Sequence, residues 1–395
     1  MSSIGRPTQT QNLGPFNNVV YMRYRGQFRG ASGDLEFSVP YEITVPRNPS
    51  EGAPIFVFEP PHVVSGLIAR DTLLGPNFLF GNRYSHASVG FGNRGGHVLD
   101  PNAPFEIKIK GNLIKPILPD SRETELVDFD IMRQFAAALR RSDSDLFGEV
   151  RHIYAVGFSN SGKTVNDIYR EFGHKSFDLT MAGTAPYAEP VKIAGQSPVI
   201  VLNTEKDFDA RAIPKPDFPA YRYYAIAGGP HIPDARQTRQ VFTGEPLPAI
   251  AGITPINWLP IARALFKAGD KWIRDGKQLP PNATFRLNAG GEIVRDERQN
   301  ALGGIRHPAV ELGEGRFIAS VDRNGWDLFG GYRNPRQLTA VEYSAYVRSF
   351  KQKTDALFDA GYLLERGRDR LHRHAQLKPN NTYTLNYREG LLYRD

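Results

Sequence analysis

Short apolar runs alternate with amphipathic segments along most of this chain. The runs are rich in Val, Ile, Phe and Tyr and are bounded by Gly or Pro, which is typical of buried strands. We expect strands within residues 18–30, 36–46, 53–60, 85–92, 151–159, 176–185, 197–205 and 221–229.

The amphipathic segments carry apolar residues three and four positions apart, which places those residues on one face of a helix. Strands that alternate with such helices argue for a mostly parallel sheet flanked by helices, an α/β fold. We expect helices within residues 63–80, 124–141, 162–173, 256–276 and 337–361.

The pattern loosens after Gly276, where residues 277–335 are rich in Gly, Pro, Asn and Arg and are expected to form long loops. We therefore expect an α/β core in residues 1–276 and a C-terminal extension of loops and a helix in residues 277–395. No linker separates the two parts, so they are expected to pack as one compact domain. The extension is a candidate to cover the core and to shape a substrate pocket.

Composition excludes several classes of protein. The 395 residues contain no run of about 18 apolar residues, so no membrane-spanning helix is expected. The N-terminus lacks the apolar segment of an intact signal peptide, which leaves both a cytoplasmic protein and an exported, processed one open. Cysteine is absent, which excludes disulfides, thiolate metal ligands and a cysteine nucleophile.

The formal net charge of +7 raises the question of a nucleic-acid partner. The basic residues are spread along the chain, and the one dense run is residues 366–374. We therefore expect an Arg-rich surface and no nucleic-acid partner. His372 and His374 lie in that run and are expected to belong to a solvated tail, not to a metal site.

The stretch VGFSNSGKTV, residues 156–165, has two interpretations. As GxxxxGK[ST] it is the phosphate-binding loop of nucleotide enzymes. Such an enzyme also needs a strand ending in Asp to hold Mg²⁺, and the best candidate strand ends in Asn203 instead. As Gly-x-Ser-x-small-Gly it is a nucleophile elbow, where small residues let a strand and a helix pass closely around Ser159.

A serine nucleophile needs a base and an acid that orients the base. In the elbow fold these follow in the order Ser, Asp or Glu, His. Asp207 and Glu205 both lie just past one expected strand, and His231 lies just past the next. We assign Ser159 as nucleophile, His231 as base and Asp207 as acid, with Glu205 as the alternative acid.

Five stretches together look like the α/β-hydrolase domain-containing family, a largely uncharacterised group of esterase-like serine hydrolases. They are IFVFEPPHVVSG, AVGFSNSGK, PVIVLNTEKDFDARA, AIAGGPHIPD and WLPIARALFKAGDKWIRDG. The resemblance covers about residues 20–276, and a weaker similarity extends to about residue 365. It implies an α/β-hydrolase fold with an eight-stranded, mostly parallel sheet, and hydrolysis of an ester or amide. Ser161, where many hydrolases have Gly, agrees with this family.

The expected reaction is cleavage of a small-molecule carboxylic ester, without a cofactor or metal. The oxyanion would be held by the backbone N–H of Asn160 and by a second N–H. Pro60 and Pro61 have no N–H, which points to His62 or Val63. A catalytically inactive, ligand-binding hydrolase fold and a nucleotide-binding protein remain as alternatives. The ester itself and the oligomeric state are left open.

Overall fold

The chain forms two compact units in the computed structural model. The first unit comprises Met1–Ala182 and Val191–Val199, and the second comprises Gly183–Pro190 and Ile200–Asp395. The structure describes residues 2–48, 54–60, 74–90, 106–109, 112–114, 122–141, 146–172, 176–185, 197–214, 220–233, 254–321 and 328–376. The expected core of residues 1–276 and extension of residues 277–395 stay a prediction.

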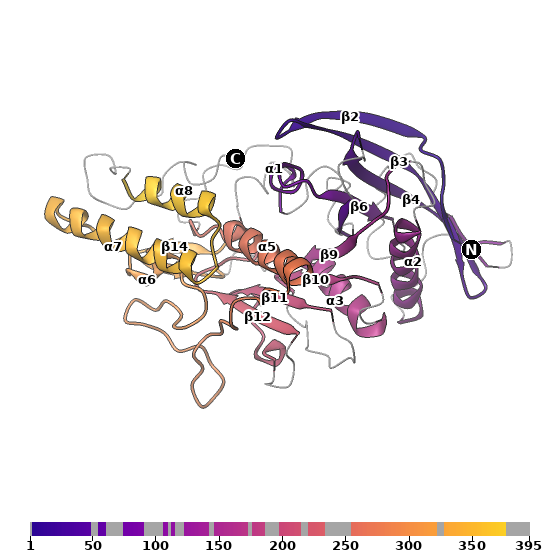
Figure 1. The fold of residues 1–395 in the computed structure, drawn as a ribbon. Helices are drawn as coiled ribbons and strands as arrows, with labels where there is room; N and C mark the ends of the chain where they lie inside the picture. The colour runs from indigo at the N-terminus through magenta and orange to yellow at the C-terminus, as the bar shows by residue number, and fades with distance from the viewer. Residues whose placement is uncertain are drawn as a thin grey trace. The chain divides into compact units, whose positions relative to one another are not determined.

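The first unit begins with antiparallel strands (Figure 1). Strand β3 (Val19–Ser32) pairs with β1 (Ser3–Ile4), β2 (Gln9–Phe16) and β4 (Leu35–Pro46). Gly33, at φ 59°, makes the turn between β3 and β4, where a side chain would strain the backbone. Strand β4 also pairs with β7 (Glu106–Ile109), which pairs with β8 (Asn112–Ile114).

Parallel strands follow in the same unit. Strand β6 (Ser85–Val89) pairs antiparallel with β4, and beyond β6 the order is β5 (Ile55–Phe58), β9 (His152–Phe158) and β10 (Leu179–Gly183). Strand β5 runs parallel to both β6 and β9. All four residues of β5 are buried, as expected for a strand that is covered on both faces.

Three helices belong to the first unit, namely α1 (Pro76–Gly81), α2 (Arg122–Arg140) and α3 (Asn160–Phe172). Helix α2 contacts β3 and α3. Its residues Met132, Phe135 and Leu139, three and four positions apart and therefore on one face, are fully buried. The Phe135 ring lies 5.1 Å from that of Phe28 on β3, so α2 packs on the antiparallel strands.

The second unit contains strands β11 (Val199–Thr204) and β12 (Tyr221–Ile226), which are neighbours in the sheet. A short 3₁₀ helix, Ala210–Ala212, follows β11. Helix α5 (Leu259–Asp275) ends at Gly276, whose φ of 67° gives the left-handed cap expected there. The remaining elements are α6 (Pro308–Glu311), β13 (Arg316–Ile318), β14 (Gly331–Arg333), α7 (Ala340–Asp359) and α8 (Glu365–Gln376).

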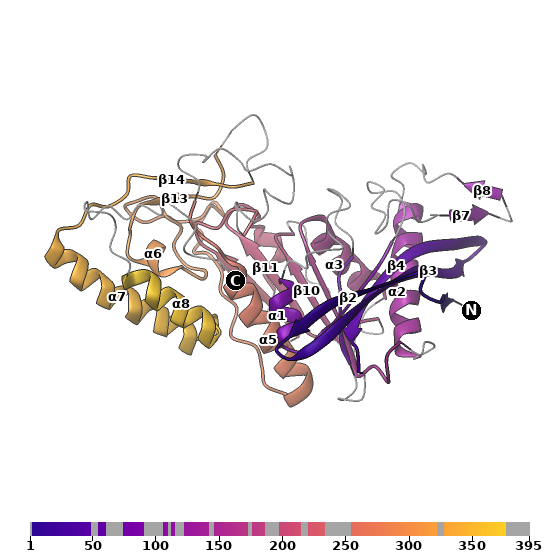
Figure 2. The ribbon, with the colours of Figure 1, turned by 90° about the horizontal axis from the view of Figure 1, so that it is seen from above.

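Every strand predicted from an apolar run is present. Strands β1, β2, β7, β8, β13 and β14 are additional, and the last two lie in residues 277–335, where only loops were expected. The main sheet has 12 described strands instead of the expected eight. The predicted helix in residues 63–80 is described only in its last part, as α1, because residues 61–73 lie outside the described residues. The solvated tail expected at residues 366–374 is wrong. These residues belong to α8, which lies beside α7 (Figure 2) and buries Leu371, while Tyr343 donates a hydrogen bond to the Ala375 carbonyl.

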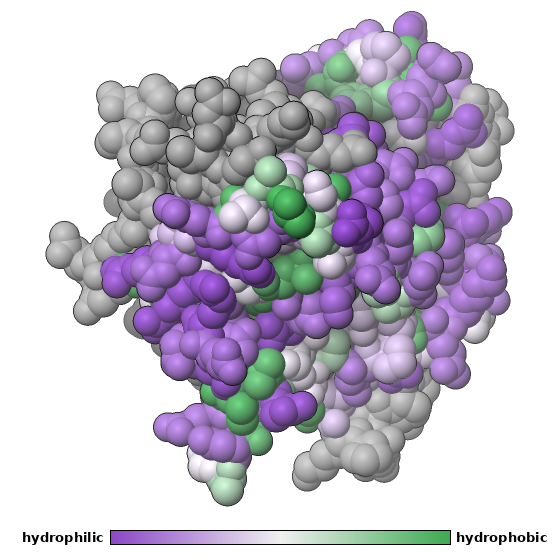
Figure 3. Space-filling model, turned by 90° about the vertical axis from the view of Figure 1, so that its left-hand side faces the viewer, coloured by the Kyte–Doolittle hydropathy of each residue, from purple (hydrophilic) through white to green (hydrophobic). Residues whose placement is uncertain are grey.

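The surface near α7 and α8 is mainly hydrophilic. Figure 3 shows that face, on which hydrophobic residues gather only in small, separate patches. Val341, with 82% exposure, is the large hydrophobic residue exposed on α7. Among the residues that the structure describes, no helix is long and apolar enough to cross a membrane.

Two histidines of the second unit, the buried His307 and the partly buried His374, lie near Phe350. Burial lowers the pKa of His307 from 6.5 to about 3 and that of His374 to about 4. Both rings lie 6.0 Å from the ring of Phe350 on α7. His307 Nδ1 accepts a hydrogen bond from the Ala309 N–H, which requires that nitrogen to be unprotonated.

We expect acid to destabilise this unit. Below pH 6.5 the unfolded chain binds more protons than the folded one at His307, so the stabilisation is complete above pH 6.5 and is lost as pH falls towards 3. One pKa unit corresponds to about 1.4 kcal/mol, so about 2 kcal/mol should be lost at His307 by pH 5. Urea unfolding at pH 7.5 and pH 5 measures this loss.

The matched variant is His307→Asn, whose side chain can still accept the Ala309 N–H as a helix cap. Its free energy of unfolding should depend less on pH than that of the wild type. Equal acid sensitivity in the two proteins would contradict the assignment.

Candidate active site

Ser159 occupies a one-residue turn between β9 and α3. Strand β9 ends at Phe158, and α3 begins at Asn160. The φ of Ser159 is 56°, in the left-handed region that residues other than Gly rarely adopt. Backbone strain at a serine between a strand and a helix is the geometry of a nucleophile elbow.

Small residues around Ser159 allow this turn. A Cβ atom at Gly157 would overlap the backbone carbonyl of Ser161 in the first turn of α3. Ser161 is buried, and its hydroxyl both accepts from the Phe158 N–H and donates to the Phe158 carbonyl, each at 2.9 Å. The serine at this position therefore fits because the backbone satisfies its hydroxyl group.

Gly157→Ala should destabilise the protein by roughly 3 kcal/mol, because the new methyl group would push the strand and the helix apart. Thermal unfolding measures the effect. Gly148→Ala is the matched control, since a Cβ atom there meets nothing within 4 Å. Similar melting temperatures for the two variants would contradict the close approach of β9 and α3 at Gly157.

The phosphate-loop interpretation finds little support in this geometry. A single residue between strand and helix leaves no loop to wrap around a phosphate. Lys163 pairs with Asp167 one helical turn later, at 2.5 Å. The Thr164 hydroxyl, which would bind Mg²⁺ in a nucleotide enzyme, donates to the Asn160 carbonyl at 3.0 Å.

Asp207 and His231 lie together in the second unit. His231 Nδ1 and Asp207 Oδ1 are 2.8 Å apart, and since a carboxylate only accepts, the imidazole donates. Asp207 Oδ2 accepts from the Thr204 hydroxyl at 2.8 Å. The two side chains are only 6% and 16% exposed, so each carboxylate oxygen is fixed in a mostly dry environment. We call these two residues the Asp207–His231 pair.

The turn that carries His231 is anchored on both sides. The Trp258 indole N–H donates to the Pro230 carbonyl at 3.1 Å, and the Ile232 N–H donates to the Leu328 carbonyl at 3.0 Å. Trp258 is fully buried and precedes α5. The imidazole is therefore held by its backbone as well as by Asp207.

Glu205 has different partners from Asp207. One oxygen accepts the Gly228 N–H at 2.8 Å, and the other accepts from Arg295 Nη1 at 2.7 Å. The structure thus brings His231 to Asp207 and not to Glu205. Sequence reasoning missed Thr204 and Arg295, and Arg295 has no local signal because it lies 90 positions from Glu205.

The expected oxyanion donors fall partly within the described residues. Asn160 is exposed and is the first residue of α3, so its N–H has no acceptor within the helix. That N–H lies next to Ser159, at the positive end of the helix dipole. His62 and Val63 lie outside the described residues. Among the described residues, no three His, Asp or Glu side chains converge as metal ligands would.

The chain is similar to known proteins in sequence and in fold. A family model described as "Alpha/beta hydrolase domain" matches residues 81–373. No curated protein matches the chain.

Similar solved structures include three esterases. Acetyl xylan esterase 1 from a Thermoanaerobacterium species is 14% identical over 46% of this chain and 53% of that chain, with a TM-score of 0.29. The rice cell wall degrading esterase LipA from Xanthomonas oryzae is 14% identical over 46% and 50%, with a TM-score of 0.29. Brefeldin A esterase, a bacterial homologue of human hormone sensitive lipase, is 10% identical over 42% and 40%, with a TM-score of 0.28. The chain spans about half or less of these solved chains, and likeness at such TM-scores carries no argument about substrate.

Proposed function

Because the chain belongs to the alpha/beta hydrolase domain family, whose model matches residues 81–373, we propose that it is a serine hydrolase acting on carboxylic esters. The family match confirms the resemblance and the α/β-hydrolase fold expected from the sequence. The observation that carries the proposal is Ser159 in a left-handed turn of one residue between β9 and α3. Such a turn exposes a hydroxyl group at the end of a strand, where a substrate can reach it.

In the proposed reaction the Ser159 hydroxyl oxygen attacks the ester carbonyl carbon. His231 Nε2 takes the hydroxyl proton and returns it to the leaving alcohol, which yields an acyl-enzyme. His231 then takes a proton from water, and the water oxygen attacks the acyl carbonyl carbon. The bond to the Ser159 oxygen breaks, His231 returns the proton to that oxygen, and the acid is released. Asp207 accepts the Nδ1–H of His231, which keeps Nε2 available as a base and stabilises the imidazolium that forms.

The tetrahedral intermediate carries a negative charge on the former carbonyl oxygen. The N–H of Asn160 would donate to it, aided by the dipole of α3. For the second N–H donor to the oxyanion, the prediction of His62 or Val63 is unchanged. This scheme uses no metal or cofactor, since the serine, the imidazole and the backbone donors supply each step.

A fluorophosphonate probe tests the proposal. It should label the protein with one adduct, and mass spectrometry of the digest should place that adduct on Ser159. The same protein should hydrolyse p-nitrophenyl esters, and a series of acyl lengths would define the pocket. A protein without labelling, turnover or nucleotide binding would be the inactive binder, and ATP binding lost in Lys163→Ala would support the nucleotide protein.

A further inference from the structure

Glu205 and Arg295 form an ion pair next to the Asp207–His231 pair. Arg295 Nη1 lies 2.7 Å from Glu205 Oε1, and the Glu205 side chain is only 4% exposed. The other oxygen of Glu205 accepts the Gly228 N–H at 2.8 Å. One buried carboxylate therefore joins three segments: the turn after β11, the turn after β12 and the segment around Arg295.

The first two of these segments carry the Asp207–His231 pair. Glu205 precedes Asp207 by two residues, and Gly228 precedes His231 by three. The backbone adds a bond between the turn after β11 and the end of β12, because the Glu205 N–H donates to the Ile226 carbonyl at 3.0 Å. The Glu205 carboxylate thus helps to set the separation between the turn of Asp207 and the turn of His231.

Gly228 leaves little room for these turns to shift. Its φ is 67°, and a Cβ atom there would lie 2.7 Å from the Cβ of Phe317. Phe317 is buried on β13. The N–H that Glu205 accepts therefore comes from a tightly packed position, and its direction is fixed.

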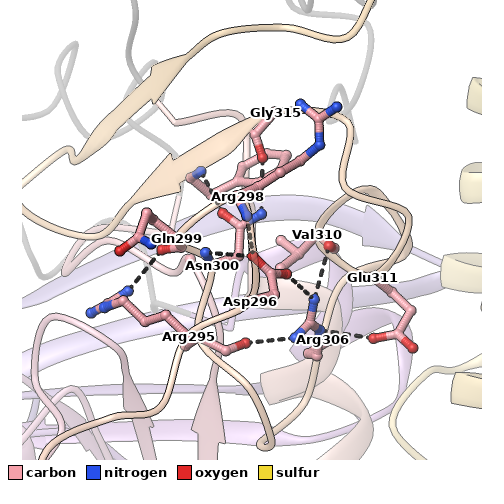
Figure 4. Close-up of polar contacts among 12 residues, drawn as sticks. Arg295, Asp296, Arg298, Gln299, Asn300, Arg306, Val310, Glu311 and Gly315 are labelled. Carbon is pink, nitrogen blue, oxygen red and sulfur yellow. Dashed lines mark hydrogen bonds and ion pairs between the residues drawn. The ribbon is translucent and has the colours of Figure 1, made fainter.

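Arg295 belongs to a loop whose side chains form several hydrogen bonds and ion pairs with one another and with its backbone, as Figure 4 shows. Its guanidinium also donates to the Gln299 carbonyl at 3.1 Å. The neighbouring Asp296 accepts the N–H groups of Arg298 and Asn300 at 3.0 and 2.9 Å, and it pairs with Arg306 at 2.9 Å. The Gln299 carbonyl and the ordered loop restrict the Arg295 guanidinium independently of Glu205. Less side-chain entropy is therefore lost when the ion pair with Glu205 forms.

We propose that Arg295 is a positioning residue that, through Glu205, holds the turns of Asp207 and His231 at the spacing their hydrogen bond needs. The proposal rests on the proposed function of that pair. Without the guanidinium, Glu205 is a buried charge with only the Gly228 N–H as partner, and such a charge draws in water or moves outward. Movement of either turn would misplace the imidazole, and a misplacement of about 1 Å can cost about 100-fold in rate.

The test uses the full chain with Arg295→Met, Arg295→Lys and the control Lys353→Met. Lys353 forms a comparable ion pair with Glu311 at 3.2 Å in the same unit, but both side chains are more exposed, at 45% and 35%. The readouts are the ring proton signals of His231 in an NMR spectrum, assigned with His231→Gln, and kcat and KM for a p-nitrophenyl ester.

Arg295→Met should shift or broaden the His231 signals and lower kcat by about 10- to 100-fold with little change in KM. Arg295→Lys should recover most of kcat because it restores the positive charge, and Lys353→Met should match the wild type. If Arg295→Met does not fold, the double variant with Arg295→Met and Glu205→Gln takes its place. In that variant the new Gln side chain can still accept the Gly228 N–H, and no unpaired charge is buried. Unchanged His231 signals and unchanged kcat in the folded variant would overturn the proposal.

The NMR readout also separates this proposal from the hydrolase function. If the wild type neither turns over esters nor reacts with a fluorophosphonate, the proposed function fails. The His231 signals then decide the positioning role alone: a change in Arg295→Met that is absent in Lys353→Met supports it, and no change refutes it.

Discussion

Ser159→Ala should lower kcat for ester hydrolysis by about 10⁴- to 10⁶-fold and abolish labelling by a fluorophosphonate. The variant removes only the hydroxyl oxygen. Alanine has the same Cβ as serine, so the backbone strain at φ 56° is unchanged and the elbow should keep its shape. Rates of p-nitrophenyl ester hydrolysis and melting temperatures, measured on the same preparations, separate chemistry from folding.

Lys163→Ala is the matched control for this prediction. Lys163 lies on the first turns of the same helix, and its ion pair with Asp167 is worth only about 0.3–0.5 kcal/mol. Its kcat should stay close to that of the wild type. A Ser159→Ala protein that retained more than a few per cent of the wild-type rate would exclude Ser159 as the nucleophile.

Asp207→Asn should lower kcat by about 10⁴-fold while the fold is retained. The reason lies in the partners of the carboxylate. Because the Thr204 hydroxyl donates to Oδ2, an Asn at this position would keep its oxygen there and point its NH₂ group at His231. His231 would then have to accept at Nδ1 and carry its proton on Nε2, the tautomer that cannot take a proton from Ser159.

The matched control is Asp209→Asn, two residues along the same turn. Asp209 caps the short 3₁₀ helix and pairs with Arg211, which keeps the pKa of its carboxyl below the usual value. An asparagine can still cap this helix, so activity should change by less than about 2-fold. If Asp207→Asn kept most of kcat and a Glu205 variant lost it, Glu205 would be the acid.

Most of the fold was readable from the sequence because its buried strands are continuous apolar runs between Gly and Pro. Strand β5, with all four residues buried, is an example. Helix α8 was not predicted because it has few apolar residues: Leu371 and Ala375 are buried, and most of its other residues are polar or charged. Strands β7 and β8 are too short for a period to be recognised.

The elbow was readable because its geometry demands small residues at fixed spacings around Ser159. The choice between Asp207 and Glu205 as the acid could not be settled from the sequence, because both residues lie on one turn at plausible distances from β11. It depends on which carboxylate faces His231, and Glu205 faces away from it because Arg295 and Gly228 hold it elsewhere. A contact between residues 90 positions apart, such as that of Glu205 with Arg295, produces no periodic pattern from which a single sequence could predict it.

The one-residue turn at Ser159 also limits how this chain can change in length. Each residue added to or removed from a helix rotates the rest by about 100° around the axis. An insertion between Phe158 and Asn160 would therefore swing the buried face of α3, with Val165, Ile168 and Tyr169, towards solvent. Insertions and deletions that the surface loops can absorb would here disrupt the packing of a whole helix.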